Sequence, residues 1–552
     1  SCNELGGCYM NEWWKNEIAY QIYPRSFKDS NHDGIGDIKG ITEKLDYLSD
    51  LGVTLLWLCP IYKSPMDDNG YDISDYYDIN PEFGTMDELI SETKKRNIKI
   101  IMDLVLNHSS DEHEWFKKAL KDPACKEHDY YIFKQGTKRP NNWRSVFGGS
   151  VWEKVEGRDE YYMHSFSKKQ PDLNWENPAL RQELYKMINW WLEKGIAGFR
   201  VDAINFIKKD QSYCDGKVDG HDGLSSCFDY CRNQPGIEVF FDELKKETFA
   251  KHNCMTVAEA VGVEYKDLGI FIGDQGCFSM MFDFNYSNFD IDKDEQWFNR
   301  ENWDIPTFKK LLFTSQEEVQ KLGWIASFLE NHDQPRAISK FFPDKKDHNY
   351  YTNTLLAGMF FNLRGTPFIY QGEEIGMENF ERTSIDEFDD ISSISQYKRA
   401  MEEGYTKEEA LHFINLRSRD NTRTPMQWDD SVFGGFSSHV PWIKMTGNQD
   451  RINAASQIHD PHSIYSFYKK MISIRKQEET LVLGDFKALK TPDEVIGYTR
   501  SYKNEEIICL CNFSNQTVPY TLQEGAILLS NYEENDTQAL KPHQFIMIKR
   551  CH

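Results

Sequence analysis

Short apolar, β-branched runs recur along the first two thirds of the chain, and stretches with helical spacing such as 41–51 and 179–193 separate them. Strands that alternate with helices are typical of β-α-β units and of a parallel sheet. The predicted strands are residues 18–24, 54–58, 99–105, 198–201, 255–258, 278–284, 324–329 and 366–370. Because eight such units close a ring, we expect an α/β fold of the (β/α)8 TIM-barrel class.

The alternation breaks in places that predict additions to the barrel. Residues 109–175, after the third strand, are rich in Trp, Tyr, Lys and Gly and indicate an inserted lid domain. Residues 377–430 are polar, helical and irregular. From residue 479 to 552, short alternating runs with turn residues between them predict a C-terminal antiparallel β-sandwich domain. The barrel itself is then expected to comprise residues 10–108 and 176–478.

Three predicted strands lead into a carboxylate, in Gly-Phe-Arg-Val-Asp202, Met-Thr-Val-Ala-Glu259 and Phe-Leu-Glu-Asn-His-Asp333. The strand ends of a barrel converge on one face, so these acids can share a pocket. Cleavage of a glycosidic bond needs one carboxylate as nucleophile and one carboxyl group as proton donor, and a third can hold sugar hydroxyls. The alternative is three unrelated surface acids in a chain with 88 Asp and Glu. Their joint occurrence favours a retaining glycosidase.

Composition excludes several classes of partner. The net charge of −24 argues against nucleic acid and against an anionic membrane, since both require clustered Lys and Arg. The chain has no run of about 18 apolar residues and no signal-peptide pattern at its start. We therefore expect a soluble, cytoplasmic monomer that acts on a neutral oligosaccharide. Residues 1–9, which precede Met10, are interpreted as an added or disordered tail.

The 12 cysteines lack paired spacing, which predicts free, buried thiols. Cys227 and Cys231 form an isolated CxxxC, which is only weak support for a metal. A stronger candidate is the segment 29–37, which places oxygen ligands at alternate positions with a Gly for the turn, as in loops that bind Ca²⁺ or Mg²⁺. Gly40 stands where an EF-hand has its Glu, so a structural ion is expected, and an ion-free Asx turn is the alternative. The expected ligands are Asp29, Asn31, Asp33, the carbonyl of Ile35, and Asp37.

The motifs together resemble glycoside hydrolase family 13, the α-amylase family, and within it the oligo-1,6-glucosidase and α-glucosidase branch. The resemblance covers the chain from Trp13 to the last strand. The segments that match the family's ordered regions are Asp103-Leu-Val-Leu-Asn-His108, Gly198-Phe-Arg-Val-Asp202, Glu259 and Asn331-His332-Asp333. Those that match the branch are Gln170-Pro-Asp-Leu-Asn174, Asp68-Asn-Gly-Tyr71 and Arg423-Thr-Pro-Met-Gln-Trp428.

The resemblance implies roles for the acids that agree with the chemistry. Asp202 would attack the anomeric carbon, and Arg200 on the same strand face would hold it ionised, unless that arginine is only a structural ion pair. Glu259 would protonate the leaving oxygen, which requires a raised pKa. In a retaining enzyme the two carboxyl groups stand about 5 to 5.5 Å apart. Asp333 would bind ring hydroxyls in the transition state, and Asp103 would orient Arg200 or Tyr71.

The resemblance also implies a closed sugar pocket. His108 and His332 are the expected partners of sugar hydroxyls in the first subsite, and Tyr71 is the expected aromatic floor. Asp68 and Arg419 would close the far end, which leaves room for one terminal glucose and makes the enzyme exo-acting. Asp172 and Asn174 are expected to tie the lid to the barrel.

Linkage preference is less well determined. In the branch, Val after the nucleophile accompanies α-1,6 cleavage, whereas Ala or Thr accompanies enzymes that also take α-1,4 bonds or sucrose, and here the residue is Ala203. One or two methyl groups discriminate by only about 1 to 3 kcal/mol, so mixed activity is expected. Alternatives are a sucrose isomerase or glucosyltransferase, for which the basic patch is absent at 289–294, and a trehalose-6-phosphate hydrolase, for which no basic cluster is evident. A non-catalytic transporter heavy chain is a further alternative, but it would lack the acids.

Overall fold

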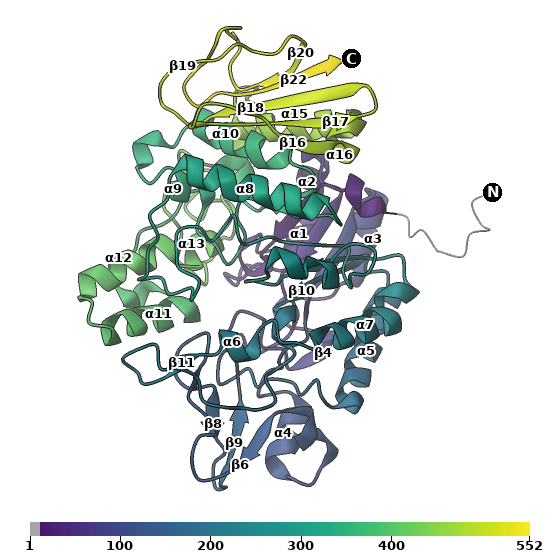
Figure 1. The fold of residues 1–552 in the computed structure, drawn as a ribbon, viewed down its shortest axis with the longest axis vertical. Helices are drawn as coiled ribbons and strands as arrows, with labels where there is room; N and C mark the ends of the chain where they lie inside the picture. The colour runs from purple at the N-terminus through teal and green to yellow at the C-terminus, as the bar shows by residue number, and fades with distance from the viewer. Residues whose placement is uncertain (1–11) are drawn as a thin grey trace, which may run out of the picture.

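The centre of the protein is a closed ring of eight parallel strands, seen in a computed structural model that describes residues 12–552 (Figure 1). The order of the strands around the ring follows the chain, and a parallel bridge between Met281 and Ile325 completes it. The predicted TIM barrel is confirmed. Its strands are β1 (Ala19–Ile22), β2 (Leu55–Leu58), β5 (Lys99–Val105), β10 (Gly198–Asp202), β12 (Met255–Ala258), β13 (Met280–Met281), β14 (Ala326–Phe328) and β15 (Thr366–Tyr370).

Helices fill the connections between the strands and cover the outside of the ring. The predicted helix 179–193 is α5 (Pro178–Glu193), which starts where the Asn177 side chain accepts the N–H of Ala179. The predicted helix 41–51 is two helices, because Lys44 leaves helical geometry at ψ 6°. The other barrel helices are α1 (Ile38–Glu43), α2 (Leu45–Leu51), α3 (Asp87–Lys95), α6 (Phe228–Cys231), α7 (Ile237–Glu247), α8 (Ile305–Gln320), α9 (Ala337–Phe341), α10 (Tyr350–Phe361), α14 (Ala454–Gln457), α15 (Ile464–Gln477) and α16 (Glu479–Leu483).

The segment after β5 builds a small unit at one end of the molecule (Figure 1). It contains α4 (Glu114–Lys121) and a three-stranded sheet, and β7 (Trp143–Arg144) pairs outside it with β11 (Ser225–Ser226) in the loop after β10. Asp172 lies 2.9 Å from Lys209 Nζ, which joins this segment to the barrel as expected. Asn174 instead donates to the carbonyl of Asp129 within the same segment. The sheet consists of β6 (Phe133–Gln135), β9 (Glu160–Met163) and β8 (Trp152–Lys154).

Two further insertions, one a β-hairpin and one helical, extend this scaffold near the ends of the barrel strands. After β2, the short strands β3 (Tyr62–Lys63) and β4 (Asp75–Ile79) pair antiparallel. The polar stretch after β15 is largely helical, as predicted, and contains α11 (Ile391–Glu402), α12 (Lys407–Arg417) and α13 (Asp420–Arg423). These excursions supply the loops that surround the carboxyl ends of the strands.

The C-terminal strands form an antiparallel five-stranded sheet, which confirms the predicted C-terminal β domain. A two-stranded ribbon, β19 (Val518–Pro519) with β21 (Ala539–Leu540), packs on it through a cluster that includes Leu540, Ile508 and Ile546. In spatial order the sheet is β16 (Asp485–Ala488), β17 (Val495–Tyr502), β18 (Glu505–Asn512), β22 (Phe545–Cys551) and β20 (Ala526–Ser530).

Helix α10 connects the barrel to this sheet. Its sequence, Tyr-Tyr-Thr-Asn-Thr-Leu-Leu-Ala-Gly-Met-Phe-Phe, is apolar on every side, as expected for a helix covered all round. A Cβ at Gly358 would lie 2.4 Å from the ring of Phe545, and Tyr498 Oη donates to the Met359 carbonyl at 2.7 Å. Side chains of the barrel and of the C-terminal sheet therefore belong to one continuous hydrophobic core.

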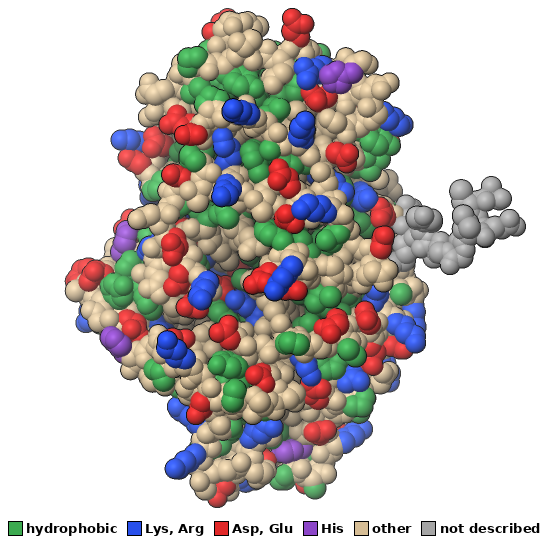
Figure 2. All heavy atoms as spheres, in the orientation of Figure 1, with side chains coloured by type: hydrophobic (Ala, Val, Ile, Leu, Met, Phe, Trp, Pro, Cys, Tyr) green, Lys and Arg blue, Asp and Glu red, His purple; other side chains and the backbone are tan. Residues whose placement is uncertain are grey.

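Ten cysteines lie among residues 12–552, all are free thiols, and seven are buried, in agreement with the prediction. The prediction for residues 1–9 lies outside the described residues. Within the described chain, no helix is both long and apolar enough to cross a membrane. Acidic and basic side chains are interspersed over the face shown in Figure 2.

Candidate active site

Three acids meet at the carboxyl ends of the barrel strands. Asp202 is the last residue of β10, Glu259 directly follows β12, and Asp333 lies in the turn after β14. All three side chains line one pocket. The structure thus brings together the acids that the sequence separates widely, because parallel strands in a barrel end on the same face.

Arg200 holds two of these acids from below. Its Nη1 lies 2.9 Å from Asp202 Oδ1 and 2.8 Å from Asp103 Oδ1, and its Nη2 contacts Glu259 Oε2. The guanidinium is fully buried, so these charge-assisted hydrogen bonds are little weakened by water. Asp103 also accepts from Tyr71 Oη at 2.9 Å and therefore orients both residues, as expected from its position.

Burial changes the protonation of the two acids that Arg200 joins. It raises the pKa of Glu259 to about 7, against the opposing effect of Arg200. Burial also raises the pKa of Asp202 well above its ordinary value, and the neighbouring Glu259 raises it further. Two carboxyl groups in such an environment titrate as a pair. At neutral pH the pair can therefore keep one proton for donation and one charge for attack.

The backbone after Asp202 contributes to the same arrangement. Ala203 adopts the left-handed conformation, with φ 40° and ψ 38°, which is uncommon for a residue with a Cβ. In this conformation its N–H donates to Glu259 Oε1 at 3.1 Å. The strained residue thereby fixes the acid beside the strand end that carries Asp202.

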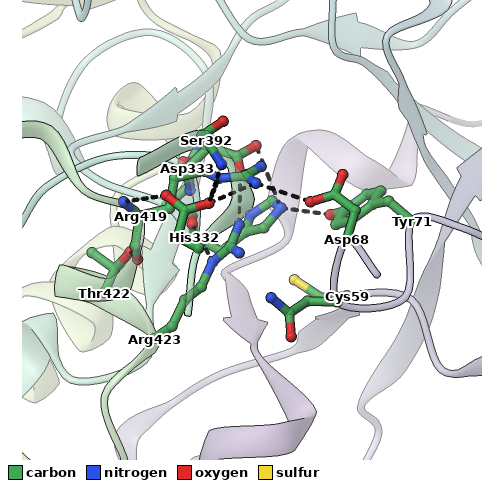
Figure 3. Close-up of polar contacts among 12 residues, drawn as sticks. Cys59, Asp68, Tyr71, His332, Asp333, Ser392, Arg419, Thr422 and Arg423 are labelled. Atoms are coloured by element: carbon green, nitrogen blue, oxygen red, sulfur yellow. Dashed lines mark hydrogen bonds and ion pairs between the residues drawn. The ribbon is translucent and has the colours of Figure 1, made fainter. Parts of the chain in front are cut away.

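Asp333 occupies a cationic environment, in which Arg200 Nη2 lies 4.0 Å from its Oδ2. Its Oδ1 lies 3.3 Å from Arg419 Nη1 and 3.1 Å from Arg423 Nη2, and Figure 3 shows these side chains facing Asp68 and Tyr71. Burial alone would raise the pKa of Asp333, but the charges of Arg419 and Arg423 lower it below its ordinary value. Asp333 is therefore an anion that can accept hydrogen bonds from hydroxyl groups.

Two predicted substrate-contact residues lie beneath the pocket rather than on its wall. Arg200 and His332 are both fully buried. The Nδ1 of His332 is 2.8 Å from Gln21 Nε2, and its Nε2 is 2.5 Å from Tyr71 Oη. Burial lowers the pKa of His332 well below its ordinary value, so the ring is neutral. In this structure His332 supports Tyr71, with which it stacks at a centroid distance of 5.4 Å.

The remaining predicted contacts line one end of the pocket. Arg419 Nη2 lies 2.9 Å from Asp68 Oδ1, and this ion pair joins the loop after β2 to the loop after α12. His108 is buried, which lowers its pKa to about 4, and its Nε2 is 3.1 Å from the Tyr71 carbonyl. Gln170 donates to Asp68 Oδ2 at 3.3 Å. The Asp68–Arg419 pair thus closes this end.

Three residues of the site were not among the predicted contacts. Gln170 and Arg423 lie in segments that match the branch motifs, so the sequence indicated that these segments are functional. It did not predict which residues they contact. Asp390 has no such signal: it holds Arg419 at 2.8 Å from a loop before α11. Buried ion pairs between distant loops leave no periodic pattern in a sequence.

The predicted metal loop lies after β1, away from the acids. Asp29 Oδ2 accepts from Ser437 Oγ at 2.6 Å, and Asp37 caps α1 by accepting the N–H of Gly40 at 2.7 Å. Asp33 Oδ1 accepts the N–H of Ile35 at 2.9 Å. These bonds alone would also suit an ion-free turn.

Asn31 bridges two acids of this loop through its side-chain amide. The amide nitrogen donates to Asp29 Oδ1 at 2.9 Å and to Asp33 Oδ1 at 3.0 Å. The side chains of Asp29, Asn31 and Asp33 therefore lie together within one hydrogen-bond network. Across residues 12–552 no group of three or more His, Cys, Asp or Glu side chains is placed to hold a metal ion, and this applies to Cys227 and Cys231 as well as to the acids of the loop 29–37.

The fold is a β/α barrel, and its strand ends carry two carboxyl groups joined by an arginine and a third carboxylate that is an anion. This combination defines a glycoside hydrolase. Residues 21–484 match the α-amylase catalytic domain, and the chain belongs to the α-amylase family. An oligo-1,6-glucosidase of Parageobacillus thermoglucosidasius is 45% identical over 544 residues, which is 96% of each chain.

Solved structures agree with this assignment. The isomaltulose synthase of Protaminobacter rubrum is 39% identical, with a TM-score of 0.93 over 97% of this chain and 99% of that chain. The trehalose-6-phosphate hydrolase of Bacillus licheniformis is 38% identical, with a TM-score of 0.89 over 98% of this chain and 100% of that chain. The fold is thus shared among relatives with different substrates, so the substrate must be argued from the pocket.

Proposed function

We propose that the protein is a retaining, exo-acting α-glucosidase that removes the terminal non-reducing glucose from short α-1,6- or α-1,4-linked gluco-oligosaccharides. The observation that carries this proposal is the Asp68–Arg419 ion pair, 2.9 Å long, at the end of a pocket lined by Asp202, Glu259 and Asp333. A chain cannot run past a pair that joins two walls, so one sugar unit fits beyond the acids.

The proposed reaction has two displacements. Asp202 attacks the anomeric carbon while Glu259, in its protonated form, gives its proton to the leaving oxygen. Glu259 then removes a proton from water, which attacks the glucosyl ester on Asp202 and restores the original configuration. Asp333 accepts hydrogen bonds from ring hydroxyls, and these strengthen as positive charge develops on the ring.

The pocket favours a neutral sugar over a phosphorylated one. Each of its three lining arginines already holds a carboxylate within 3.1 Å, which leaves their charges largely compensated. The pairs are Arg144 with Asp222, Arg417 with Asp290, and Arg419 with Asp68. Among the relatives, the oligo-1,6-glucosidase therefore fits the site better than the trehalose-6-phosphate hydrolase. Ala203 lines the pocket and leaves room for more than one linkage geometry.

Proton NMR tests this function directly. Samples of isomaltose, maltose, sucrose and trehalose are followed in parallel for the first anomer of glucose released. Early α-glucose from isomaltose or maltose is expected, and new glycosidic signals from sucrose would indicate an isomerase instead. Early β-glucose, or no turnover of any sugar by folded protein, would contradict the proposal.

We also infer that the loop 29–37 binds a structural Ca²⁺ or Mg²⁺. Support comes from the alternate spacing of the expected ligands Asp29, Asn31, Asp33, the Ile35 carbonyl and Asp37, and from the contact of the first three side chains with one another. The ion would hold the loop after β1 and would take no part in the reaction.

Saturating Ca²⁺ or Mg²⁺ is expected to raise the melting temperature of chelator-treated protein by a few degrees, since an ion that binds only the folded state stabilises it. Asp33→Ala should abolish the shift and leave kcat nearly unchanged. Asp46→Ala, at an exposed acid that pairs only with Arg96, should keep it. Calorimetry with elemental analysis is the measurement. Absence of both a bound ion and a shift would mean that the loop is an ordinary turn held by its own hydrogen bonds.

A further inference from the structure

Four segments that are remote in sequence wall the pocket beyond the catalytic acids. One is the segment 284–297, which follows β13 and contributes Phe284 and Trp297 among others. The other three are the residues after β7, with Ser145 to Phe147, the residues from the end of β11, with Ser226 to Phe228, and α11, with Ser392 and Gln396. The Asp68–Arg419 pair closes the opposite end, so the part of the substrate that leaves lies among these four walls.

The last three of these segments also carry charged groups of one ion-pair network, in which Asp222 contacts both of the others. Arg144, at the end of β7, forms a bidentate pair with Asp222 at 2.7 Å and also contacts Asp219 at 2.7 Å. Arg399 of α11 lies 3.4 Å from Asp222 and 3.0 Å from Glu403. We name Arg144, Asp219, Asp222 and Arg399 the rim clamp. Asp222 is its centre, because it contacts an arginine from each of the other two segments.

The clamp residues lie close in the chain to the residues that wall the pocket. Ser392, Gln396 and Arg399 recur at helical spacing on one face of α11, so the helix presents wall and clamp residues on the same side. Both clamp arginines are buried, at 5% exposure each. Two buried guanidinium groups around one carboxylate are stable only while the carboxylate is charged and in place.

The approach of the segments is close enough to require a glycine. A Cβ at Gly220 would lie 2.6 Å from Arg144 Nη2 and 3.1 Å from Arg399 Nη2. The loop 219–222 is thus packed between the arginines without spare room. A side chain at this position would push the clamp arginines apart.

We propose that the rim clamp sets the length of saccharide that the enzyme accepts, by holding three of the four walls around the departing part of the substrate. The proposal rests on the proposed α-glucosidase function. With the clamp intact, the walls fit one or two sugar units beyond the scissile bond. Loss of the Asp222 charge leaves Arg144 with Asp219 and Arg399 with Glu403, just after its own helix, so no ion pair of the clamp holds α11 to the other walls and the walls then separate.

The test compares kcat/KM for two-unit and four-unit oligosaccharides of the linkage that the wild-type protein hydrolyses. Asp222→Asn keeps the side-chain shape and removes the charge, and Gly220→Ala opens the clamp sterically. Either variant is expected to raise the four-unit to two-unit ratio by about five-fold, the size of a small change in pocket contacts. Glu243→Gln, which breaks the Arg181–Glu243 pair outside the pocket, is the matched control and should leave the ratio unchanged.

An unchanged ratio in folded Asp222→Asn and Gly220→Ala proteins would overturn the proposal and leave the clamp a purely structural feature. If only one variant folds, its ratio decides. If the wild-type protein hydrolyses no sugar, the proposed function is wrong. In that case the ratio of dissociation constants for the same two sugars, from calorimetry, tests the clamp separately. Failure to bind either sugar would overturn the clamp as well.

Discussion

Asp202→Asn is expected to lower kcat by about 10⁵-fold, because an amide of the same shape cannot attack the anomeric carbon, and loss of a nucleophile typically has an effect of this size. KM should change little, since the amide can keep its place beside Arg200. Initial rates on isomaltose and on an aryl α-glucoside measure both constants. Residual activity above about one hundredth of the wild-type value would assign the nucleophile elsewhere.

The covalent step gives this prediction a second readout. A fluorinated glucosyl fluoride that slows hydrolysis of the intermediate should leave a glucosyl adduct on the wild-type peptide that contains Asp202, seen by mass spectrometry. The Asp202→Asn protein should show no adduct. Asp46→Asn, a charge change at an exposed surface acid, should show both normal activity and the adduct.

Glu259→Gln is expected to lower kcat/KM on isomaltose by about 10³-fold, within the range for loss of a general acid. An aryl glucoside whose leaving group departs as a stable anion needs no proton, so glucosyl transfer from it to Asp202 should be much less affected. Without Glu259 no base activates the water that hydrolyses the intermediate, so the intermediate should accumulate. Burst kinetics are therefore expected on this substrate. Equal losses on both substrates would contradict the assignment of Glu259 as proton donor.

The same residue sets the pH dependence on the alkaline side. Burial raises the pKa of Glu259 to about 7, and the reaction needs its protonated form. The wild-type kcat/KM on isomaltose is therefore expected to fall as the pH rises through about 7. Glu259→Gln should lose this limb because its amide does not titrate. Stopped assays between pH 5 and 9 at constant ionic strength provide the profile.

The barrel was predictable because its strands are buried on both faces and read as continuous apolar runs. The limits of β5, β12 and β15 agree with the runs 99–105, 255–258 and 366–370 residue for residue. The long run predicted at 278–284 shrinks to the two residues of β13, because apolar residues after it pack as loop. A hydrophobic run indicates that its residues are buried. It forms a strand only where its backbone pairs with a neighbouring strand.

The active site also has a part that the sequence predicts and a part that it does not. Its acids were predictable because they end such runs, and the barrel brings strand ends together. The burial of His332 beneath Tyr71 and the left-handed Ala203 depend on tertiary packing, which leaves no mark on residue spacing. The rim clamp was equally invisible, since each of its charges lies in a polar loop where charged residues are ordinary.

Helix α10 makes the C-terminal sheet inseparable from the barrel in any exchange of parts between relatives. The helix is encoded in the barrel region, yet Phe545 of the sheet occupies the space that Gly358 leaves open. A chimera that joins this barrel to the last strands of another family member would pair surfaces that have not adapted to each other. A chimera is therefore expected to keep its stability only when α10 and the C-terminal sheet come from the same parent.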